Sequence, residues 1–196
     1  RNTPGIMTAP GLLFDMDGVL IDSTPFPRRA LIEFCRRKGL ELSEEMLRTR
    51  VFGRPNQDWI PDLFPGISDE EASRFADEKE AYYREIYADD IEPWTGLLPF
   101  LERAREAELP MTIGTSAPPE NVTFVVEKLG LGSFLSKSVD ATRVTEGKPH
   151  PQAYLLCAEE LGLPPEQSIV FEDSLVGVQD GVAAGCPTIG ISAEPK

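Results

Sequence analysis

The stretch Leu12–Thr24, LLFDMDGVLIDST, changes abruptly from an apolar run to a pair of aspartates. The run Leu12–Phe14 is typical of a strand buried on both faces, as in a parallel sheet covered by helices. Asp15 and Asp17 follow it, and residues i and i+2 of an extended segment point to the same side. Two like charges about 4 Å apart repel by roughly 4 kcal/mol at an effective dielectric constant near 20, so we expect a compensating cation.

The rest of the chain continues this pattern of strands and helices. Three further apolar runs predict buried strands, at Met111–Ile113, Ile169–Phe171 and Thr188–Ile191. Amphipathic or capped segments predict helices at Pro99–Glu108, Pro119–Leu129, Gln152–Leu161 and Ser174–Ala184. The alternation predicts an α/β fold, a Rossmann-like parallel sheet core with helices on both faces.

Residues 23–91 have a different character, because they hold helical patterns and no clear strand. Helices are predicted at Arg28–Lys38, at Ser43–Arg50, and from a capping box at Ser68–Glu71 toward Ala88. We therefore expect an inserted all-α cap domain at 23–91, and an α/β core made of residues 8–22 and 92–196.

Composition narrows the class of protein. The chain has 196 residues, 41% of them hydrophobic, and a formal net charge of −14. A negative charge of this size repels nucleic acid and anionic lipid, so neither is an expected partner. No apolar run approaches the roughly 18 residues of a membrane-spanning helix. The three cysteines form no CxxC motif and are expected to be buried free thiols in a reducing, cytoplasmic setting.

Polar residues stand at the ends of three predicted strands, where ligands bind in open parallel sheets. They are Asp15 and Asp17, Thr115 and Ser116, and Glu172 and Asp173. Oxygen ligands without a local histidine or cysteine suit a hard divalent ion, most simply Mg²⁺. The alternative is that these acids cap helices or pair with surface arginines. Gly18 permits a tight turn and a close approach of the backbone.

Lys148 supplies the positive charge that an anionic substrate would need in so acidic a protein. It lies in EGKPHPQAY, a segment that Pro149 and Pro151 keep from becoming helical. Together with Mg²⁺, the Thr115 hydroxyl and free helix N–H groups, it would make a phosphate site. His150, the single histidine, is expected to be a loop residue without a catalytic role.

Four segments carry a resemblance to a known family. FDMDGVLIDS, TIGTSAP, GKPHPQAY and VFEDSLVGVQDGVAAG resemble, in order, the four motifs of the haloacid dehalogenase superfamily of phosphohydrolases. The match covers nearly the whole chain, with a helical cap inserted after the first strand. Within that superfamily the chain is similar to the β-phosphoglucomutase-like branch.

The resemblance implies a role for each motif residue. Asp15 would be the nucleophile that forms an aspartyl-phosphate, and Asp17 the general acid and then base. Asp15, the Asp17 carbonyl, Asp173 and Glu172 would bind Mg²⁺, Glu172 directly or through water. The substrate phosphoryl group would be held by Gly18, Thr115, Ser116 and Lys148, and Arg54 in the cap would contact the substrate.

The branch contains mutases as well as phosphatases. Mutases of that kind carry a histidine twelve residues after the nucleophile, where this chain has Pro27. The predicted function is therefore a Mg²⁺-dependent phosphatase acting on a small phosphorylated metabolite, a sugar or polyol phosphate. A sugar-phosphate mutase is the alternative, followed by a non-catalytic binding module. We expect a monomer, with a dimer as the alternative.

Overall fold

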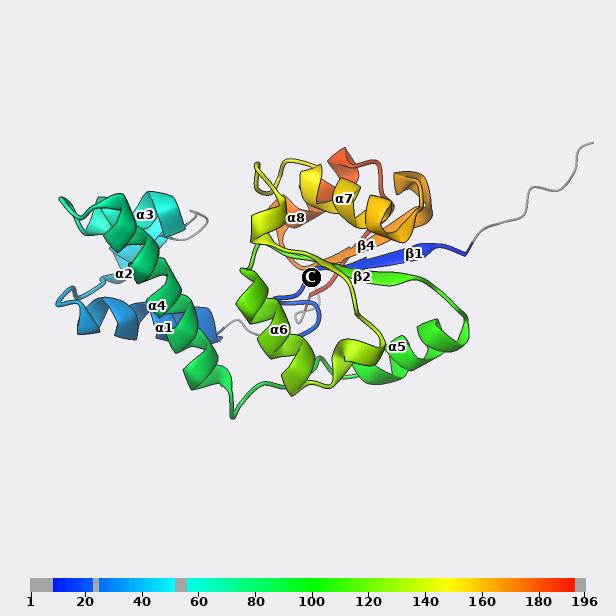
Figure 1. Ribbon diagram of the computed structural model, residues 1–196, viewed down its shortest axis with the longest axis horizontal. Coiled ribbons are helices and arrows are strands. Elements are labelled where there is room, and N and C mark those ends of the chain that lie inside the picture. The colour runs from blue at the N-terminus through cyan, green and yellow to red at the C-terminus, as the bar shows by residue number, and fades with distance from the viewer. Residues whose placement is uncertain (1–8, 23–24, 52–55, 193–196) are drawn as a thin grey trace, which may run out of the picture. The chain divides into compact units, whose positions relative to one another are not determined.

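The computed structural model describes residues 9–22, 25–51 and 56–192. They divide into two compact units (Figure 1). The first, called the α/β unit below, lies within Arg1–Ser23 and Ile91–Lys196. The second, called the helical unit, lies within Thr24–Asp90. Sequence analysis predicted a helical cap at 23–91 and an α/β core at 8–22 and 92–196.

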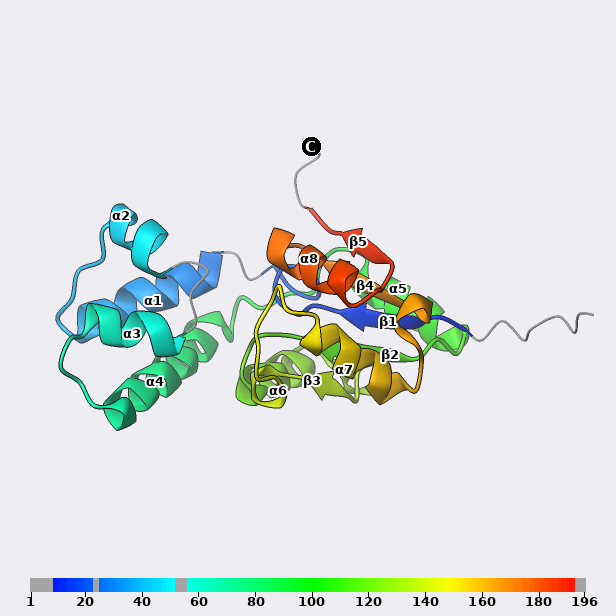
Figure 2. The same cartoon turned by 90° about the horizontal axis from the view of Figure 1, so that it is seen from above.

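A five-stranded parallel sheet forms the centre of the α/β unit. Its strands are β1 (Gly11–Phe14), β2 (Met111–Gly114), β3 (Ser138–Val139), β4 (Ser168–Glu172) and β5 (Thr188–Gly190). They are ordered β3-β2-β1-β4-β5, as Figure 2 shows from above. Leu13 of β1 lies between Thr112 of β2 and Val170 of β4. The residues that follow β1 are therefore at the middle of the carboxyl edge of the sheet.

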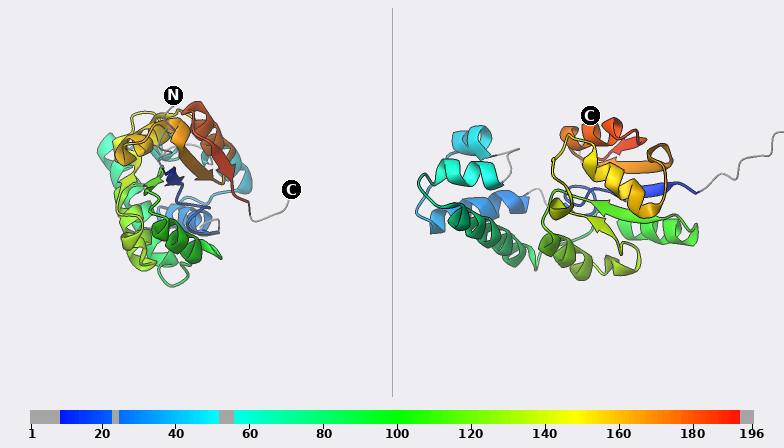
Figure 3. Two further views of the ribbon diagram at one scale, coloured as in Figure 1. Left: turned by 90° about the vertical axis from the view of Figure 1, so that its right-hand side faces the viewer. Right: turned by 45° about the horizontal axis from the view of Figure 1, so that its top comes forward.

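Helices cover both faces of this sheet (Figures 1 and 3). One face carries α7 (Gln152–Leu161) and α8 (Leu175–Ala183), and the other carries α5 (Leu97–Glu106) and α6 (Pro119–Lys128). Short 3₁₀ turns occupy Leu131–Ser133, Ala141–Arg143 and Pro165–Gln167. The predicted α/β class with a parallel sheet is confirmed.

Successive residues of β1 serve the two faces in turn, as strand geometry requires. Leu13 belongs to a buried cluster under α7 and α8 that includes Tyr154 and Cys157. Phe14 points to the other face, where its ring stacks on Phe171 at 5.0 Å and meets Phe100 edge-on at 6.2 Å. An apolar run without polar alternation is therefore what a strand at this position needs.

The predicted elements of the α/β unit are close to the observed ones, with one omission. The four predicted strands are found with ends shifted by at most one residue, and α7 has the predicted bounds. Strand β3 was not predicted, because it has only two residues and polar neighbours on both sides. All three cysteines are free and buried, as predicted.

The helical unit consists of α1 (Pro25–Arg37), α2 (Glu44–Met46), a π-helical turn (Leu47–Val51), α3 (Asn56–Leu63) and α4 (Asp69–Tyr87). Phe34, Phe64 and Phe75 form an edge-to-face cluster in its core, with centroid distances of 5.2 to 6.4 Å. The capping box of α4 is present: Ser68 Oγ accepts from the Glu71 N–H at 3.2 Å, and the Ser68 N–H donates to Glu71 Oε2 at 3.0 Å.

One expectation for the helical unit was wrong in detail, and one helix was not predicted. The helix predicted at Ser43–Arg50 widens into a π turn after Met46, and the Thr49 hydroxyl donates to the Glu45 carbonyl at 2.7 Å. Helix α3 was not predicted, because Pro61 lies inside it. Trp59 and Ile60 of this helix are buried, although Pro61 follows them.

Among the described residues, no helix has the length and apolar composition that crossing a membrane requires.

Candidate active site

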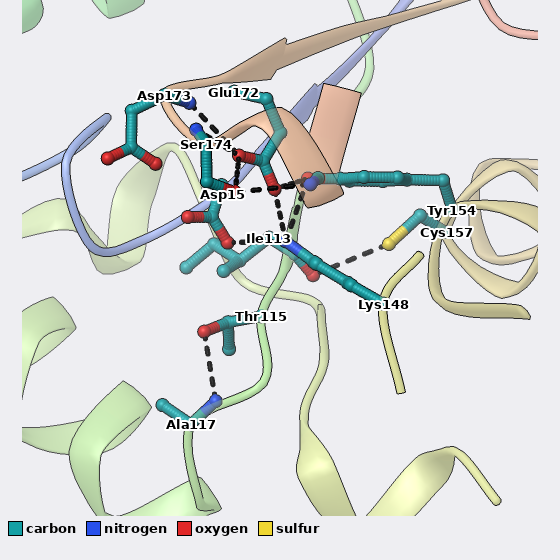
Figure 4. A network of polar contacts seen from close by, with 11 residues as sticks. Asp15, Ile113, Thr115, Ala117, Lys148, Tyr154, Cys157, Glu172, Asp173 and Ser174 are labelled. Atoms are coloured by element: carbon teal, nitrogen blue, oxygen red, sulfur yellow. Dashed lines mark hydrogen bonds and ion pairs between the residues drawn. The ribbon is translucent and has the colours of Figure 1, made fainter. Parts of the chain in front are cut away.

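Three carboxylates from two neighbouring strands meet at the carboxyl edge of the sheet (Figure 4). Asp15 follows β1, Glu172 ends β4, and Asp173 comes next. One oxygen from each lies within 4.8 Å of the others, a spacing that can hold a single metal ion. The donor set is all oxygen, which fits a hard divalent cation such as Mg²⁺. The predicted convergence of these strand ends is therefore seen in the fold.

Lys148 reaches this cluster from a loop far away in the sequence. Its Nζ donates to Asp15 Oδ1 at 2.8 Å and also to Glu172 Oε1, and its side chain is 9% exposed. The loop is shaped by Gln152 at the start of α7, whose side-chain oxygen accepts from the N–H groups of Thr145 and Glu146 at 2.8 and 3.0 Å. That turn brings a lysine from a polar loop into a buried position.

Glu172 is buried completely and both of its oxygens are hydrogen bonded. Oε1 accepts from Lys148 and from the Tyr154 hydroxyl, the latter at 3.0 Å. Oε2 accepts from the backbone N–H groups of Asp173 and Ser174 at 3.0 and 3.1 Å, and from the Ser174 hydroxyl at 3.1 Å. Ser174 is also the N-cap of α8. Glu172 is thus the best-anchored acid of the cluster.

The site has more carboxyl groups than positive charges. Burial raises the pKa of Asp15 well above its ordinary range, repulsion from Glu172 and Asp17 adds to this, and Lys148 offsets only part of it. Burial raises the pKa of Glu172 too, but the charge and hydrogen bond of Lys148 bring its net shift downward. Burial and the charge of Glu172 raise the pKa of Asp173. One lysine among these acids leaves a surplus of negative charge that a divalent cation would balance.

Asp17 and Gly18 form the turn beside this cluster. Asp17 is half-buried and close enough to raise the pKa values of both Asp15 and Asp173. Gly18 has φ +82°, and a side chain at this position would overlap the carboxylate of Asp173. Both its backbone conformation and its surroundings therefore require glycine.

The remaining predicted site residues have different environments. Thr115 follows β2 and is 3% exposed, and its hydroxyl accepts from the Ala117 N–H at 3.1 Å (Figure 4). Ser116 is exposed. His150 lies in the exposed loop, with Nε2 3.0 Å from Glu146 Oε2. Arg54 lies outside the described residues.

Two neighbours of the cluster were missed by sequence reasoning. Tyr154 is fully buried, and its hydroxyl accepts from Lys148 at 3.2 Å while donating to Glu172. It was part of the motif GKPHPQAY, and its place in the first turn of a helix after Lys148 was the available signal. Gly177 lies in the first turn of α8, where a Cβ atom would overlap the carboxylate of Glu172.

We expect Gly177→Ala to lower the free energy of unfolding by roughly 2 kcal/mol, because the added methyl group must displace Glu172 or the start of α8. Urea unfolding followed by circular dichroism measures this. Gly132→Ala is the matched control, since the nearest atom to its Cβ would be Val126 Cγ1 at 3.8 Å, and it should change stability by less than about 0.5 kcal/mol. Equal stability of the two variants would contradict the steric account.

The parallel sheet is covered by helices on both faces and carries acids and a buried lysine at its carboxyl edge. This arrangement is typical of α/β enzymes, which bind their ligands at that edge. The family model described as "haloacid dehalogenase-like hydrolase" matches residues 10–185. The chain belongs to the haloacid dehalogenase-like hydrolase family, and it is therefore a hydrolase.

Two proteins that are similar to this chain in sequence are named as phosphatases of phosphorylated carbohydrates. Hexitol phosphatase A of Escherichia coli K12 is 34% identical, over 95% of this chain and 85% of its own length. Fructose-1-phosphate phosphatase YqaB of the same organism is 30% identical, over 92% and 95%. The crystal structure of a HAD hydrolase, family IA, variant 3, from Entamoeba histolytica superposes with a TM-score of 0.86 at 33% identity, covering 95% of this chain and 86% of that one.

Proposed function

We infer that this protein is a Mg²⁺-dependent phosphatase that hydrolyses a small phosphorylated carbohydrate, a sugar or polyol phosphate, through an aspartyl-phosphate. The observation that carries this proposal is the cluster of buried Asp15, buried Glu172 and exposed Asp173, with Lys148 bonded to the first two. The substrate class is supported by the relatives named for a hexitol phosphatase and a fructose-1-phosphate phosphatase.

The phosphoryl group would be held by residues that border the acid cluster. Lys148 would turn from Asp15 toward a phosphoryl oxygen while keeping its bond to Glu172, which is fixed by five donors. Thr115, Ser116 and backbone N–H groups near Gly18 would contact the other oxygens. Arg54 is proposed as a substrate contact from the helical unit, which would act as the cap. These contacts orient the ester, and orientation with charge neutralisation is most of what phosphoryl transfer requires.

The reaction would proceed in two displacements. A carboxylate oxygen of Asp15 forms a bond to phosphorus while the bond from phosphorus to the alcohol oxygen breaks, and Asp17 gives its proton to the leaving alcohol. Asp17 then takes a proton from a water molecule, whose oxygen bonds to phosphorus as the Asp15–phosphorus bond breaks. The products are the alcohol and inorganic phosphate, and both aspartates return to their starting states.

Mg²⁺ would be held by Asp15, Asp173 and the backbone carbonyl of Asp17. Glu172 would act on it through water, because both of its oxygens are already engaged. When bound, the ion offsets the repulsion between the attacking carboxylate and an anionic ester. His150 has no part in this scheme, since it lies in the exposed loop beside Glu146.

Removal of the metal is expected to lower phosphate release by roughly 100-fold or more, because several kcal/mol of charge neutralisation are lost. The measurement is inorganic phosphate released from a panel of sugar and polyol phosphates, after treatment with EDTA and again after adding excess Mg²⁺. Added Mg²⁺ should restore the rate. Undiminished release in the presence of EDTA would rule out the metal-dependent scheme.

The same panel separates the alternatives. Glucose 1-phosphate that yields free phosphate supports hydrolysis, whereas conversion to glucose 6-phosphate supports a mutase. Pro27, at the position where mutases of this branch carry histidine, favours hydrolysis. No turnover of any ester, including 4-nitrophenyl phosphate, would favour a binding module. Sedimentation of the same sample tests the expected monomer against a dimer.

A further inference from the structure

Two segments of the α/β unit lie next to each other: the one just before the chain enters the helical unit and the one just after it returns. The chain leaves this unit after Asp22 and returns near Ile91. Ile21 and Pro93 form an antiparallel bridge, and the Trp94 N–H donates to the Leu20 carbonyl at 3.1 Å. The returning chain therefore lies directly beside the turn that follows the acidic pair.

Trp94 makes a second contact with that turn, through its side chain. Its indole Nε1 donates to the Gly18 carbonyl at 2.9 Å, across 76 residues of sequence. The Gly18 N–H donates to the Ile21 carbonyl at 2.8 Å. Gly18 also packs so closely on Asp173 that no side chain fits between them. The turn is thus in contact with Asp173 and hydrogen bonded to the indole.

Glycine has the greatest backbone freedom of any residue, and Gly18 adopts a positive φ. Its carbonyl group belongs to the Gly18–Val19 peptide, one residue beyond Asp17, so rotation of this turn about Gly18 would move the Asp17 side chain. The hydrogen bond from the half-buried Trp94 indole restricts the backbone at Gly18, which is the residue of this turn with the greatest freedom to rotate.

We propose that Trp94 is a positioning residue for Asp17, which fixes the general acid by bonding the Gly18 carbonyl. This rests on the proposed function, in which Asp17 protonates the leaving alcohol. The indole makes no chemical step itself. Its effect should appear in those reactions where protonation of the leaving group matters.

The test compares two ester substrates in Trp94→Phe, which keeps an aromatic ring and removes the N–H group. An alkyl phosphate such as a hexitol phosphate needs a proton on its leaving oxygen, whereas 4-nitrophenolate leaves readily without one. Because kcat/KM reports on steps through phosphoenzyme formation, its value for the alkyl phosphate should fall at least about tenfold more than its value for 4-nitrophenyl phosphate.

Trp59→Phe is the matched control. It deletes the same indole N–H group in the helical unit, where Trp59 Nε1 donates to Asn56 Oδ1 at 3.1 Å. It should leave the ratio of the two kcat/KM values unchanged, whatever it does to thermal stability. If Trp94 had a purely structural role, its replacement would lower kcat/KM for both esters by the same factor and leave their ratio unchanged.

An unchanged ratio in Trp94→Phe, with an active wild type, would overturn this inference and leave the proposed function standing. A wild type that turns over neither ester would overturn both together. If Trp94→Phe does not fold, Trp94 is replaced by benzothienylalanine, which exchanges the N–H for sulfur in a ring of nearly the same shape. The same selective loss for the alkyl phosphate is expected there.

Discussion

Asp15→Asn is expected to lower phosphate-ester turnover by at least about 10³-fold, while the protein folds at least as stably as the wild type at neutral pH. Asparagine keeps the size of the side chain but cannot form the acyl phosphate. It also removes a buried acid whose pKa is raised by burial and by repulsion from Glu172 and Asp17. Loss of activity with retained stability is the signature of a residue placed for chemistry.

Phosphate release and the midpoint of thermal unfolding measure these two effects on one preparation. Asp77→Asn makes the same chemical change on the exposed face of α4 and should alter neither. Turnover of Asp15→Asn within tenfold of the wild type would remove the aspartyl-phosphate from the mechanism.

Asp180→Asn is expected to stabilise the protein at pH 8 by about 2 to 4 kcal/mol. Asp180 lies in α8 and is completely buried, and within the described residues neither of its carboxylate oxygens has a hydrogen-bond partner. Burial raises its pKa to about 7; the charge of Lys148 and the neighbouring backbone of Tyr154 lower it, while the charge of Glu172 raises it. An ionised carboxylate in this place is costly, and an amide of the same size does not ionise.

The gain should depend on pH in a definite direction. An acid whose pKa is about 7 in the folded state and near 3.8 when unfolded destabilises the fold fully above pH 7. That penalty fades as the pH falls through 7 and is gone below the unfolded pKa. The stability advantage of Asp180→Asn over the wild type should therefore shrink steadily from pH 8 to pH 5.

Urea unfolding at several pH values measures this difference. Asp140→Asn is the control, because Asp140 is also buried but its Oδ1 accepts from the Thr142 N–H and hydroxyl at 2.9 and 2.6 Å. An amide oxygen can still accept both bonds but without the charge of a carboxylate, so the weaker bonds should destabilise by about 1 kcal/mol. An advantage of Asp180→Asn that stays constant between pH 5 and 8 would show that Asp180 does not titrate as described.

Local patterns in the sequence determined the sheet and the nature of its edge. An unbroken apolar run such as Leu12–Phe14 is typical of a strand covered on both faces, and polar residues after such runs mark the carboxyl edge. The capping box at Ser68 and the bounds of α7 were readable for the same reason, since capping and helical periodicity involve residues only three or four positions apart.

The tertiary structure alone decided which groups hold the acids in place. Lys148 and Asp15 are 133 residues apart in sequence, and Trp94 and Gly18 are 76 apart. How α7 and α8 are rotated against the sheet decides that the Tyr154 hydroxyl bonds to Glu172, and that the buried Asp180 carboxylate has no hydrogen-bond partner among the described residues. That rotation is set by the packing of many side chains together, and no short stretch of sequence encodes it.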